Sequence, residues 1–287
     1  MVAFEVPEVD YTRYSNRQLA AVPLVVLAVA LAILAAWTAM SGAPVALGFE
    51  FTGGTELRVS APGATADDIG SAFSVQPESV QSASDGVYIV TFGPDAPDTD
   101  TLTAQVRDQG YEVPASSDVG ASFGRNTQLL ALGGVGVAFL GMSALVFVMF
   151  RTFVPSIAVV VSAFSDIVIP VAIMNLLGIE LSLGTVAALL MLIGYSVDSD
   201  ILLNNHILRR SGDFYESVNR AMRTGVTMTL TSLSAMIVMT IIATYFGIGL
   251  LAAIGTVLAF GLATDLMNTY MLNLSLLRWY KYEGVAR

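Results

Sequence analysis

The sequence predicts a multi-pass α-helical membrane protein with six transmembrane helices and a small α+β domain between the first two. Of its 287 residues, 55% are hydrophobic and 13% are charged, and its mean hydropathy is +0.70. Six apolar stretches are each long enough to cross a hydrocarbon core of about 30 Å, which takes about 20 helical residues. One sizeable polar segment, residues 46–126, separates the first stretch from the other five.

The apolar stretches are justified one by one along the chain. The first follows Arg13 and Arg17 and exceeds the 7–15-residue apolar core of a signal peptide, so we interpret it as an uncleaved membrane anchor. The other five form a cluster over residues 129–276. The predicted spans are residues 19–40, 129–150, 153–177, 181–203, 226–246 and 250–276.

Basic residues predict the orientation, because Lys and Arg are enriched in cytoplasmic loops. With residues 1–18 inside, the C-terminal segment 277–287 is inside too, and ten of the 13 basic residues face the cytoplasm. The other three, Arg58, Arg107 and Arg125, lie between spans one and two. Both termini are therefore expected in the cytoplasm of a cell carrying this protein in its plasma membrane.

The segment 46–126 is therefore expected outside the cell. Alternating apolar residues and turn signals predict the order βαββαβ, which is the ferredoxin-like arrangement. The segment carries 12 acidic and three basic residues, so nucleic acid is not an expected partner. The predicted strands are 50–60, 79–83, 87–92 and 112–115, and the predicted helices are 66–73 and 98–109.

Composition also excludes several classes of site. The chain has no cysteine, so disulfides, thiolate catalysis and Cys-ligated metals are impossible. A His-based metal or catalytic cluster is not expected with a single histidine, His206. We therefore expect no enzyme activity, metal or cofactor. The net charge of −10, with one lysine, indicates a salt-loving organism; one acidic domain in a short membrane chain explains the same balance.

Acidic residues inside the predicted spans are the strongest functional signal, because each is costly in hydrocarbon unless paired, neutralised or hydrated. There are four, Asp166, Asp198, Asp200 and Asp265, and no Lys or Arg lies inside these spans. Such carboxyls suit an ion or proton relay, although a lone Asp166 equally suits a hydrogen bond between helices. Asp198 and Asp200 point about 200° apart on one helix, so both cannot face the same partner.

Polar residues on spans five and six extend this candidate relay. Span six carries Asn268, Thr269 and Asn273 near Asp265, and span five is rich in hydroxyls. These groups are expected either to line a hydrated path or to pack helices together. Arg223, at the cytoplasmic edge of span five, either reaches toward an Asp or anchors the helix end. Four glycines of span two predict a tight helix-packing face: Gly133, Gly134, Gly136 and Gly141.

Two motifs resemble a known family. Residues 48–55, with Gly48, Phe51, Gly53 and Gly54, resemble the G-h-(D/N/E)-F-T-G-G motif with which SecF-type proteins enter their external domain. No helix or lysine follows these glycines as in a phosphate-binding loop. Residues 193–200, with Gly194, Tyr195 and Ser196, resemble the I-G-Y-S-h-(N/D)-D-T motif of the fourth span. By these motifs, the chain is identified as a member of the SecD/SecF family of protein-export membrane proteins, SecF-like in size and related to resistance-nodulation-division transporters.

The resemblance implies a function and a set of partners. A SecF-like chain pairs with a SecD-like subunit and assists the Sec translocon, using an ion gradient, expected to be of protons, to move or release unfolded exported polypeptides across the lipid bilayer. The sequence leaves the coupling ion open between H⁺ and Na⁺. An exporter of lipids or drugs from the wider superfamily is an alternative, but those chains normally carry two six-span halves. An intramembrane aspartyl protease using Asp198 and Asp265 is a second alternative, and its Gly-x-Gly-Asp motif is missing.

The chain departs from the family motifs at two points. Asp198 stands at the Asn or Asp position, Ser199 at the following Asp position, and Asp200 at the Thr position. The wider transporter family has Asp where Asp198 stands, so the resemblance favours Asp198 as the ion-carrying residue. In span five, the family's Arg position holds Thr227, and Arg223 lies one turn earlier.

The acidic segment predicts a simple stability test. Residues 46–126, expressed alone, should be soluble, and their melting temperature should rise with KCl because salt screens repulsion among the 12 acids. Thermal unfolding from low to molar KCl measures this. A melting temperature that falls steadily with salt would contradict the interpretation of the acidic surface as an adaptation to high salt.

Overall fold

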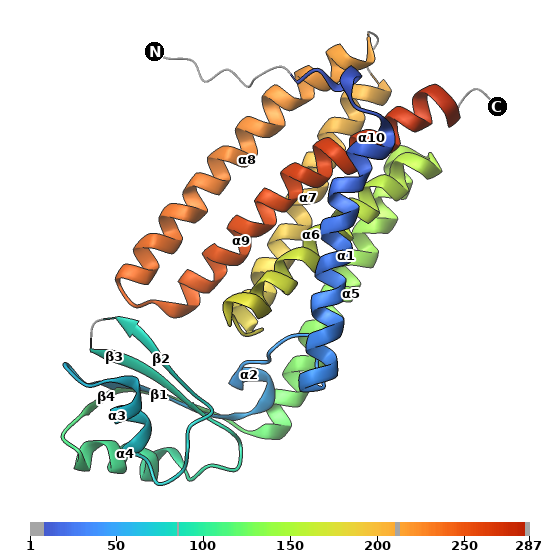
Figure 1. The fold of residues 1–287 in the computed structure, drawn as a ribbon. Coiled ribbons are helices and arrows are strands. Elements are labelled where there is room, and N and C mark those ends of the chain that lie inside the picture. Colours follow the sequence, from blue (N-terminus) through green and yellow to red (C-terminus); the bar gives the residue numbers. More distant parts are fainter. Residues whose placement is uncertain (1–8, 85, 210–212, 285–287) are drawn as a thin grey trace, which may run out of the picture.

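The computed structural model describes residues 9–84, 86–209 and 213–284. Within them, six long apolar helical segments form one bundle, and a four-stranded sheet domain lies at one end of it (Figure 1). The described parts of both termini lie at the opposite end. The expectations for residues 1–8 and 285–287, and for Arg210 between spans four and five, fall outside the described residues.

The membrane segments begin and end close to the predicted spans. Residues 153–177 were predicted and observed with the same bounds, whereas two helices begin well before the predicted residues 129 and 226. These helices continue past the apolar run into polar residues, which hydropathy does not detect. The six segments are α1 (Asn16–Ser41), α5 (Ala121–Phe150), α6 (Phe153–Leu177), α7 (Leu183–Arg209), α8 (Phe214–Tyr245) and α9 (Gly249–Met267), which continues through η2 (Asn268–Asn273), α10 (Leu274–Trp279) and η3 (Tyr280–Gly284).

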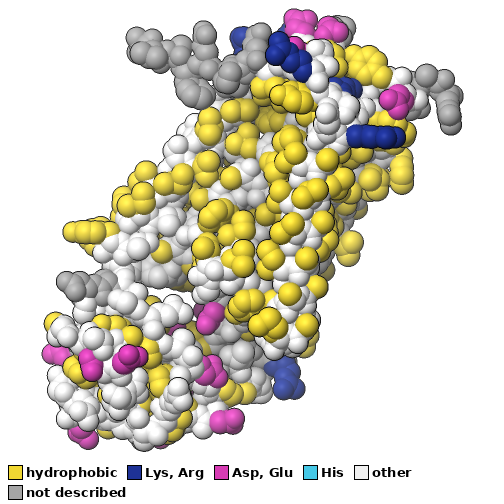
Figure 2. Space-filling view, in the orientation of Figure 1, with side chains coloured by type: hydrophobic (Ala, Val, Ile, Leu, Met, Phe, Trp, Pro, Cys, Tyr) yellow, Lys and Arg dark blue, Asp and Glu magenta, His cyan; other side chains and the backbone are white. Residues whose placement is uncertain are grey.

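Helices α6, α7 and α9 form the interior of the bundle. Over half of the most apolar window of α6 and of α7 is buried, compared with 6% for α5 and 11% for α8. On the face shown in Figure 2, hydrophobic side chains cover much of the bundle and Asp and Glu side chains are scattered over the sheet domain, as expected of a chain whose bundle faces lipid. The predicted packing face on α5 is wrong within this chain, because the described atoms leave open space around Gly133, Gly134, Gly136 and Gly141.

The sheet domain follows α1 and precedes α5. Its strands lie in the order β2-β3-β1-β4, and every neighbouring pair is antiparallel. One face of the sheet packs on α3 and α4 through a core that includes Leu57, Val90, Phe92 and Leu102. The elements are β1 (Gly54–Ser60), α3 (Ala66–Ser71), β2 (Ser79–Ser84), β3 (Val87–Phe92), α4 (Thr99–Asp108) and β4 (Glu112–Val119).

The predicted first strand is wrong over residues 50–52, which belong to a helical turn, α2 (Phe49–Thr52). Phe51 is 2% exposed and packs in the same core as Leu181 and Val186 of the bundle. Gly53 and Gly54 then turn the chain into β1 with φ of +82° and +128°. Such φ values strain any residue with a Cβ. The glycine motif is therefore a joint between bundle and sheet.

Backbone contacts hold the two parts together at that joint. Leu47 and Leu181 form a parallel bridge, in which the Leu181 amide donates to the Ala46 carbonyl at 2.7 Å. The Glu50 carboxylate accepts from the Leu183 amide at 2.6 Å, at the start of α7. From the face of the sheet that looks toward the bundle, the Arg58 guanidinium donates to the Gly247 carbonyl at 2.5 Å, between α8 and α9.

No flexible linker joins the sheet to α5. Only Gly120 separates the end of β4 from the first residue of α5. One turn into α5, the backbone crosses the joint closely: a Cβ on Gly124 would lie 2.8 Å from the Gly53 amide nitrogen. The sheet domain is thus attached rigidly to this helix.

The joint predicts a large difference between two glycines. Gly54→Ala should destabilise the sheet domain by about 3 kcal/mol or more, because the new Cβ would clash with the Phe92 carbonyl in a strained backbone. Gly120→Ala is the matched control, since it has open space and an ordinary φ of −63°. Thermal unfolding of both variants measures the difference, and equal melting temperatures would contradict the proposed role of the joint.

Candidate functional site

Three carboxylates from three helices meet inside the bundle. Asp166 of α6 is 1% exposed, Asp200 of α7 is 0% exposed and Asp265 of α9 is 1% exposed. They lie within hydrogen-bonding distance of a shared set of hydroxyl and amide side chains rather than of lysines or arginines. We call Asp166, Asp200 and Asp265, with the side chains that donate to them, the carboxylate cluster.

Asp166 has one donor for each oxygen. The Ser196 hydroxyl of α7 donates to its Oδ2 at 2.5 Å, and Nδ2 of Asn268 donates to its Oδ1 at 2.6 Å. Pro170 lies four residues further along α6 and has no amide N–H, so it cannot make the helical hydrogen bond to the Asp166 carbonyl. The Asp166 carbonyl therefore lacks its regular helical hydrogen-bond donor.

Asp200 and Asp265 share a bridging hydroxyl. The Thr269 Oγ1 lies 2.9 Å from Oδ1 of Asp200 and 3.3 Å from Oδ1 of Asp265. Nδ2 of Asn273 also donates to Asp200 Oδ1 at 2.7 Å, and the Ser199 hydroxyl donates to Asp265 Oδ1 at 2.8 Å. Because one hydroxyl contacts both carboxylates, a change of protonation at one is felt by the other.

A π-helical segment supplies most of these donors. Asn268, Thr269 and Asn273 all belong to η2, which interrupts the regular helix between α9 and α10. π-Helical turns are rare and occur frequently at functional sites. The sequence analysis left these three residues open between lining a hydrated path and packing helices together, and it found no sign of the π-helical turn that brings them together.

The cluster is incompletely satisfied. Within the described residues, Oδ2 of Asp200 and Oδ2 of Asp265 are buried without a hydrogen-bond partner. So are the amide oxygens of Asn268 and Asn273. A buried ionised carboxylate with an unpaired oxygen is expensive in an apolar bundle. The arrangement therefore suits carboxyls that bind and release a small positive charge, or that hold a few waters.

Two residues expected in the relay lie elsewhere. Asp198 is on the exposed face of α7 and takes no part in the cluster, whereas Asp200, ranked below it from sequence, is fully buried. This difference follows the helical spacing, which turns the two side chains to different faces. Arg223 is exposed on α8 and is likewise outside the cluster. The protease alternative loses its geometry, because Asp198 and Asp265 do not face each other.

The motif residues of α7 divide in the same way. Ser196 is fully buried and bonds to Asp166, while Gly194 is exposed with open space around it. Asp166, which the sequence analysis left open between a relay group and a helix contact, belongs to the cluster, and so does Ser199, which the sequence analysis did not select. Ser199 has a recoverable signal, since Ser196 and Ser199, at i and i+3, lie on the same buried side of α7 as Asp200.

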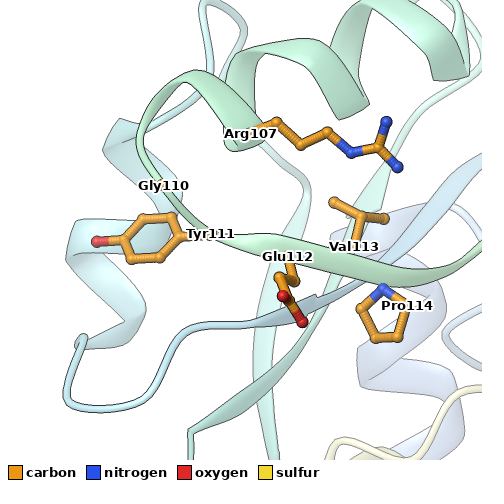
Figure 3. A pocket seen from close by; sticks show the side chains of 6 residues that line it. All are labelled: Arg107, Gly110, Tyr111, Glu112, Val113 and Pro114. Atoms are coloured by element: carbon orange, nitrogen blue, oxygen red, sulfur yellow. The ribbon is translucent and has the colours of Figure 1, made fainter.

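A surface pocket on the sheet domain brings no comparable set of polar side chains together. It has a volume of about 460 Å³ and lies beside the start of β4. Figure 3 shows its side chains pointing apart: the Tyr111 ring extends away from Arg107, and Glu112 lies on the other side of the strand from Val113. Within the described residues, no group of three or more His, Cys, Asp or Glu is arranged to hold a metal ion.

The fold and the cluster define a class: a multi-pass membrane protein with titratable groups buried at the centre of its bundle. Comparison with known proteins identifies the family. Residues 99–283 match the family model described as protein export membrane protein SecD/SecF, C-terminal. The chain is 71% identical over 288 residues to a protein-export membrane protein SecF from Haloferax volcanii, with full coverage of both. It is 41% identical to another from Methanolacinia petrolearia, over 96% of this chain and 97% of that one.

A solved structure supports the same fold. The crystal structure of SecDF, described as a translocon-associated membrane protein from Thermus thermophilus, matches with a TM-score of 0.71 at 21% identity, over 96% of this chain. The match spans 39% of that longer protein. The chain belongs to the SecD/SecF family of protein-export membrane proteins, and its SecF relatives are membrane subunits of export rather than enzymes.

The bridging hydroxyl predicts a measurable loss of stability. Thr269→Val keeps the shape of the side chain but removes the donor shared by Asp200 and Asp265, so it should lower stability by about 1–3 kcal/mol. Thr227→Val is the control, because its exposed hydroxyl bonds only its own helix backbone at Arg223. Thermal unfolding in detergent measures both, and an unchanged Thr269→Val would argue against a shared hydrogen bond.

Proposed function

We propose that this chain is the SecF-type subunit of a protein-export complex and that the carboxylate cluster couples export to a proton gradient. The observation that carries the proposal is the meeting of Asp166, Asp200 and Asp265 in the interior of an otherwise apolar bundle. Intramembrane carboxyls are costly and characteristically mark ion pathways. The exported substrate is an unfolded polypeptide, and the Sec translocon is the machine that the chain assists.

Protons fit the cluster better than metal ions as the coupling species. Every donor to these carboxylates is a neutral hydroxyl or amide, and the described residues include no group of acids arranged to hold a metal. Thr269 and Ser199 connect Asp200 to Asp265, so a proton arriving at one carboxyl changes the hydrogen bonds of the other. That change repositions α7 relative to α9 and η2.

The partner is a SecD-like subunit that covers part of the exposed face of α7 and α8. Asp198 and Gly194 lie on the bundle surface, where an exposed carboxyl in contact with lipid is costly. Small residues such as Gly194 allow another helix to approach closely. We therefore assign Asp198 and Arg223 to the subunit interface rather than to the interior relay. The exposed polar residues on α8 include Arg223, Thr227, Thr231 and Ser234.

The placement in the membrane follows from the same proposal. We infer that the sheet domain is ferredoxin-like and lies outside the cell, and that both termini are cytoplasmic. The plasma membrane is the expected location. The lipid- or drug-exporter alternative has less support, since SecF relatives match this chain over its full length.

The relay assignment predicts opposite outcomes for two neighbouring acids. Asp200→Asn deletes a titrating group in the cluster while keeping its size, so gradient-dependent export should fall at least tenfold. Asp198→Asn should retain most of that activity, because its side chain lies outside the cluster. Export into membrane vesicles, with the proton and sodium gradients collapsed separately, measures both.

This test needs a control for assembly, and two outcomes would contradict the proposal. Both variants should insert and assemble with the partner at wild-type levels, which is measured by co-purification in mild detergent. If Asp198→Asn abolishes coupled export and Asp200→Asn does not, the relay assignment is reversed. Normal export by both variants and by the double variant would remove ion coupling from this chain.

The interface assignment has its own test. Gly194→Trp fits the isolated chain, because open space surrounds Gly194, but it should block the SecD-like subunit and reduce its recovery in affinity purification several-fold. Leu130→Trp is the control, since Leu130 is 78% exposed on α5. Undiminished recovery of the partner with Gly194→Trp would show that the subunit binds a different face.

A further inference from the structure

A cleft of about 570 Å³ lies between the sheet domain and the adjoining end of the bundle. The sheet contributes the face opposite α3 and α4, through Gln81, Ile89 and Thr91. The bundle contributes the segment between α6 and α7 and the first turns of α9. The cleft belongs neither to the carboxylate cluster nor to the proposed subunit interface.

Glutamates give this cleft a net negative charge. Glu50, Glu56 and Glu180 line it. Burial, followed by the charge of Glu50, raises the pKa of Glu56, and the charge of Arg58 lowers it to a smaller extent. Burial, followed by the charges of Glu56 and Glu78, raises the pKa of Glu180. Two ion pairs of the described residues, Arg13–Asp10 and Arg220–Glu216, lie elsewhere. A positively charged occupant would relieve this repulsion.

The nearest base compensates this negative charge only in part. Arg58 projects from the same face of β1 as Glu56, but its guanidinium donates to the Gly247 carbonyl across the gap. Glu50 is also engaged, by the Leu183 amide. Glu56 and Glu180 are the carboxylates left to meet an incoming Lys or Arg side chain.

A strand edge without proline or charged residues borders the cleft. β2 and β4 are the two edges of the sheet, and Gln81 of β2 lines the cleft. Natural edge strands are commonly blunted by proline or charge. β4 carries Pro114, Glu112 and Asp118, whereas β2 reads Ser-Val-Gln-Ser-Ala-Ser, with neither. An extended polypeptide can pair with such an edge through its backbone alone, which suits a binder of many different sequences.

We propose that the β2 edge and this cleft hold an extended segment of an exported polypeptide, with its backbone paired to β2 and a basic side chain drawn along the cleft by the charges of Glu56 and Glu180. In an added strand, alternate side chains point to one face of the sheet, so every second residue would face the cleft. This inference rests on the proposed export function and names the surface that contacts the substrate.

The test uses the full chain in lipid nanodiscs and three synthetic peptides. The first is an unstructured Ser/Thr/Val peptide with one central Arg. In the second, alternate backbone nitrogens are methylated, and in the third the Arg is replaced by Gln. A photo-crosslinking amino acid at position 81 reports contact with the cleft, and one at position 100, on exposed Asp100 of α4, is the control.

The first peptide should crosslink from position 81 and not from position 100. Methylation should reduce the yield at least tenfold, because it removes strand pairing, and loss of the Arg should reduce it several-fold. Glu56→Gln with Glu180→Gln should abolish the preference for Arg, while Asp67→Asn with Asp100→Asn should leave it intact.

Equal yields from all three peptides, or crosslinking mainly from position 100, would overturn the proposal. Exclusive capture of the SecD-like subunit when both it and the peptide are present would also overturn it. Peptide capture requires neither a gradient nor the translocon, so it separates this inference from the export role. If export coupling fails while capture persists, the proposed function alone is wrong.

Discussion

The structure depends on satisfying three carboxylates inside an apolar bundle. Each of Asp166, Asp200 and Asp265 receives hydrogen bonds from side chains on other elements, so α6, α7 and η2 must meet in one register. Apolar packing alone tolerates sliding of one helix along another, whereas these directional bonds do not. The small hydroxyl and amide residues of α7 and η2 therefore determine both the position of the helices and the chemistry at their centre.

This constraint also accounts for departures from regular α-helical geometry in the interior of the bundle. The peripheral segments α5 and α8 are regular and expose apolar surfaces, and α1 contains Pro23. The interior segments carry Pro170 within α6 and the π-helical turn that follows α9. These two interior irregularities lie beside the cluster. A regular helix from Gly249 onward would rotate Asn273 relative to Thr269, and Asp200 would then lose one of its two donors.

Much of this arrangement is readable from sequence, for physical reasons. Long apolar runs predicted all six membrane segments, and the turn and capping residues predicted most elements of the sheet domain. The strand prediction failed over residues 50–52, because Phe51 gains more by packing against the bundle than by extending β1. The prediction ranked Asp198 above Asp200 because of the family resemblance. Which of the two side chains is buried depends on how α7 is rotated against its neighbours, and the sequence of α7 alone does not specify that rotation. The π-helical turn has no local sequence signal.

The direct passage from β4 into α5 has a mechanical consequence. With only Gly120 between them, and with Gly124 held against Gly53, the sheet domain behaves as an extension of a membrane helix. A 30-residue helix is about 45 Å long, so tilting α5 by about 10° around its far end would carry the sheet domain sideways by about 8 Å. The chain thus contains a lever arm: small rotations within the bilayer become displacements of nanometre order in the domain beyond it.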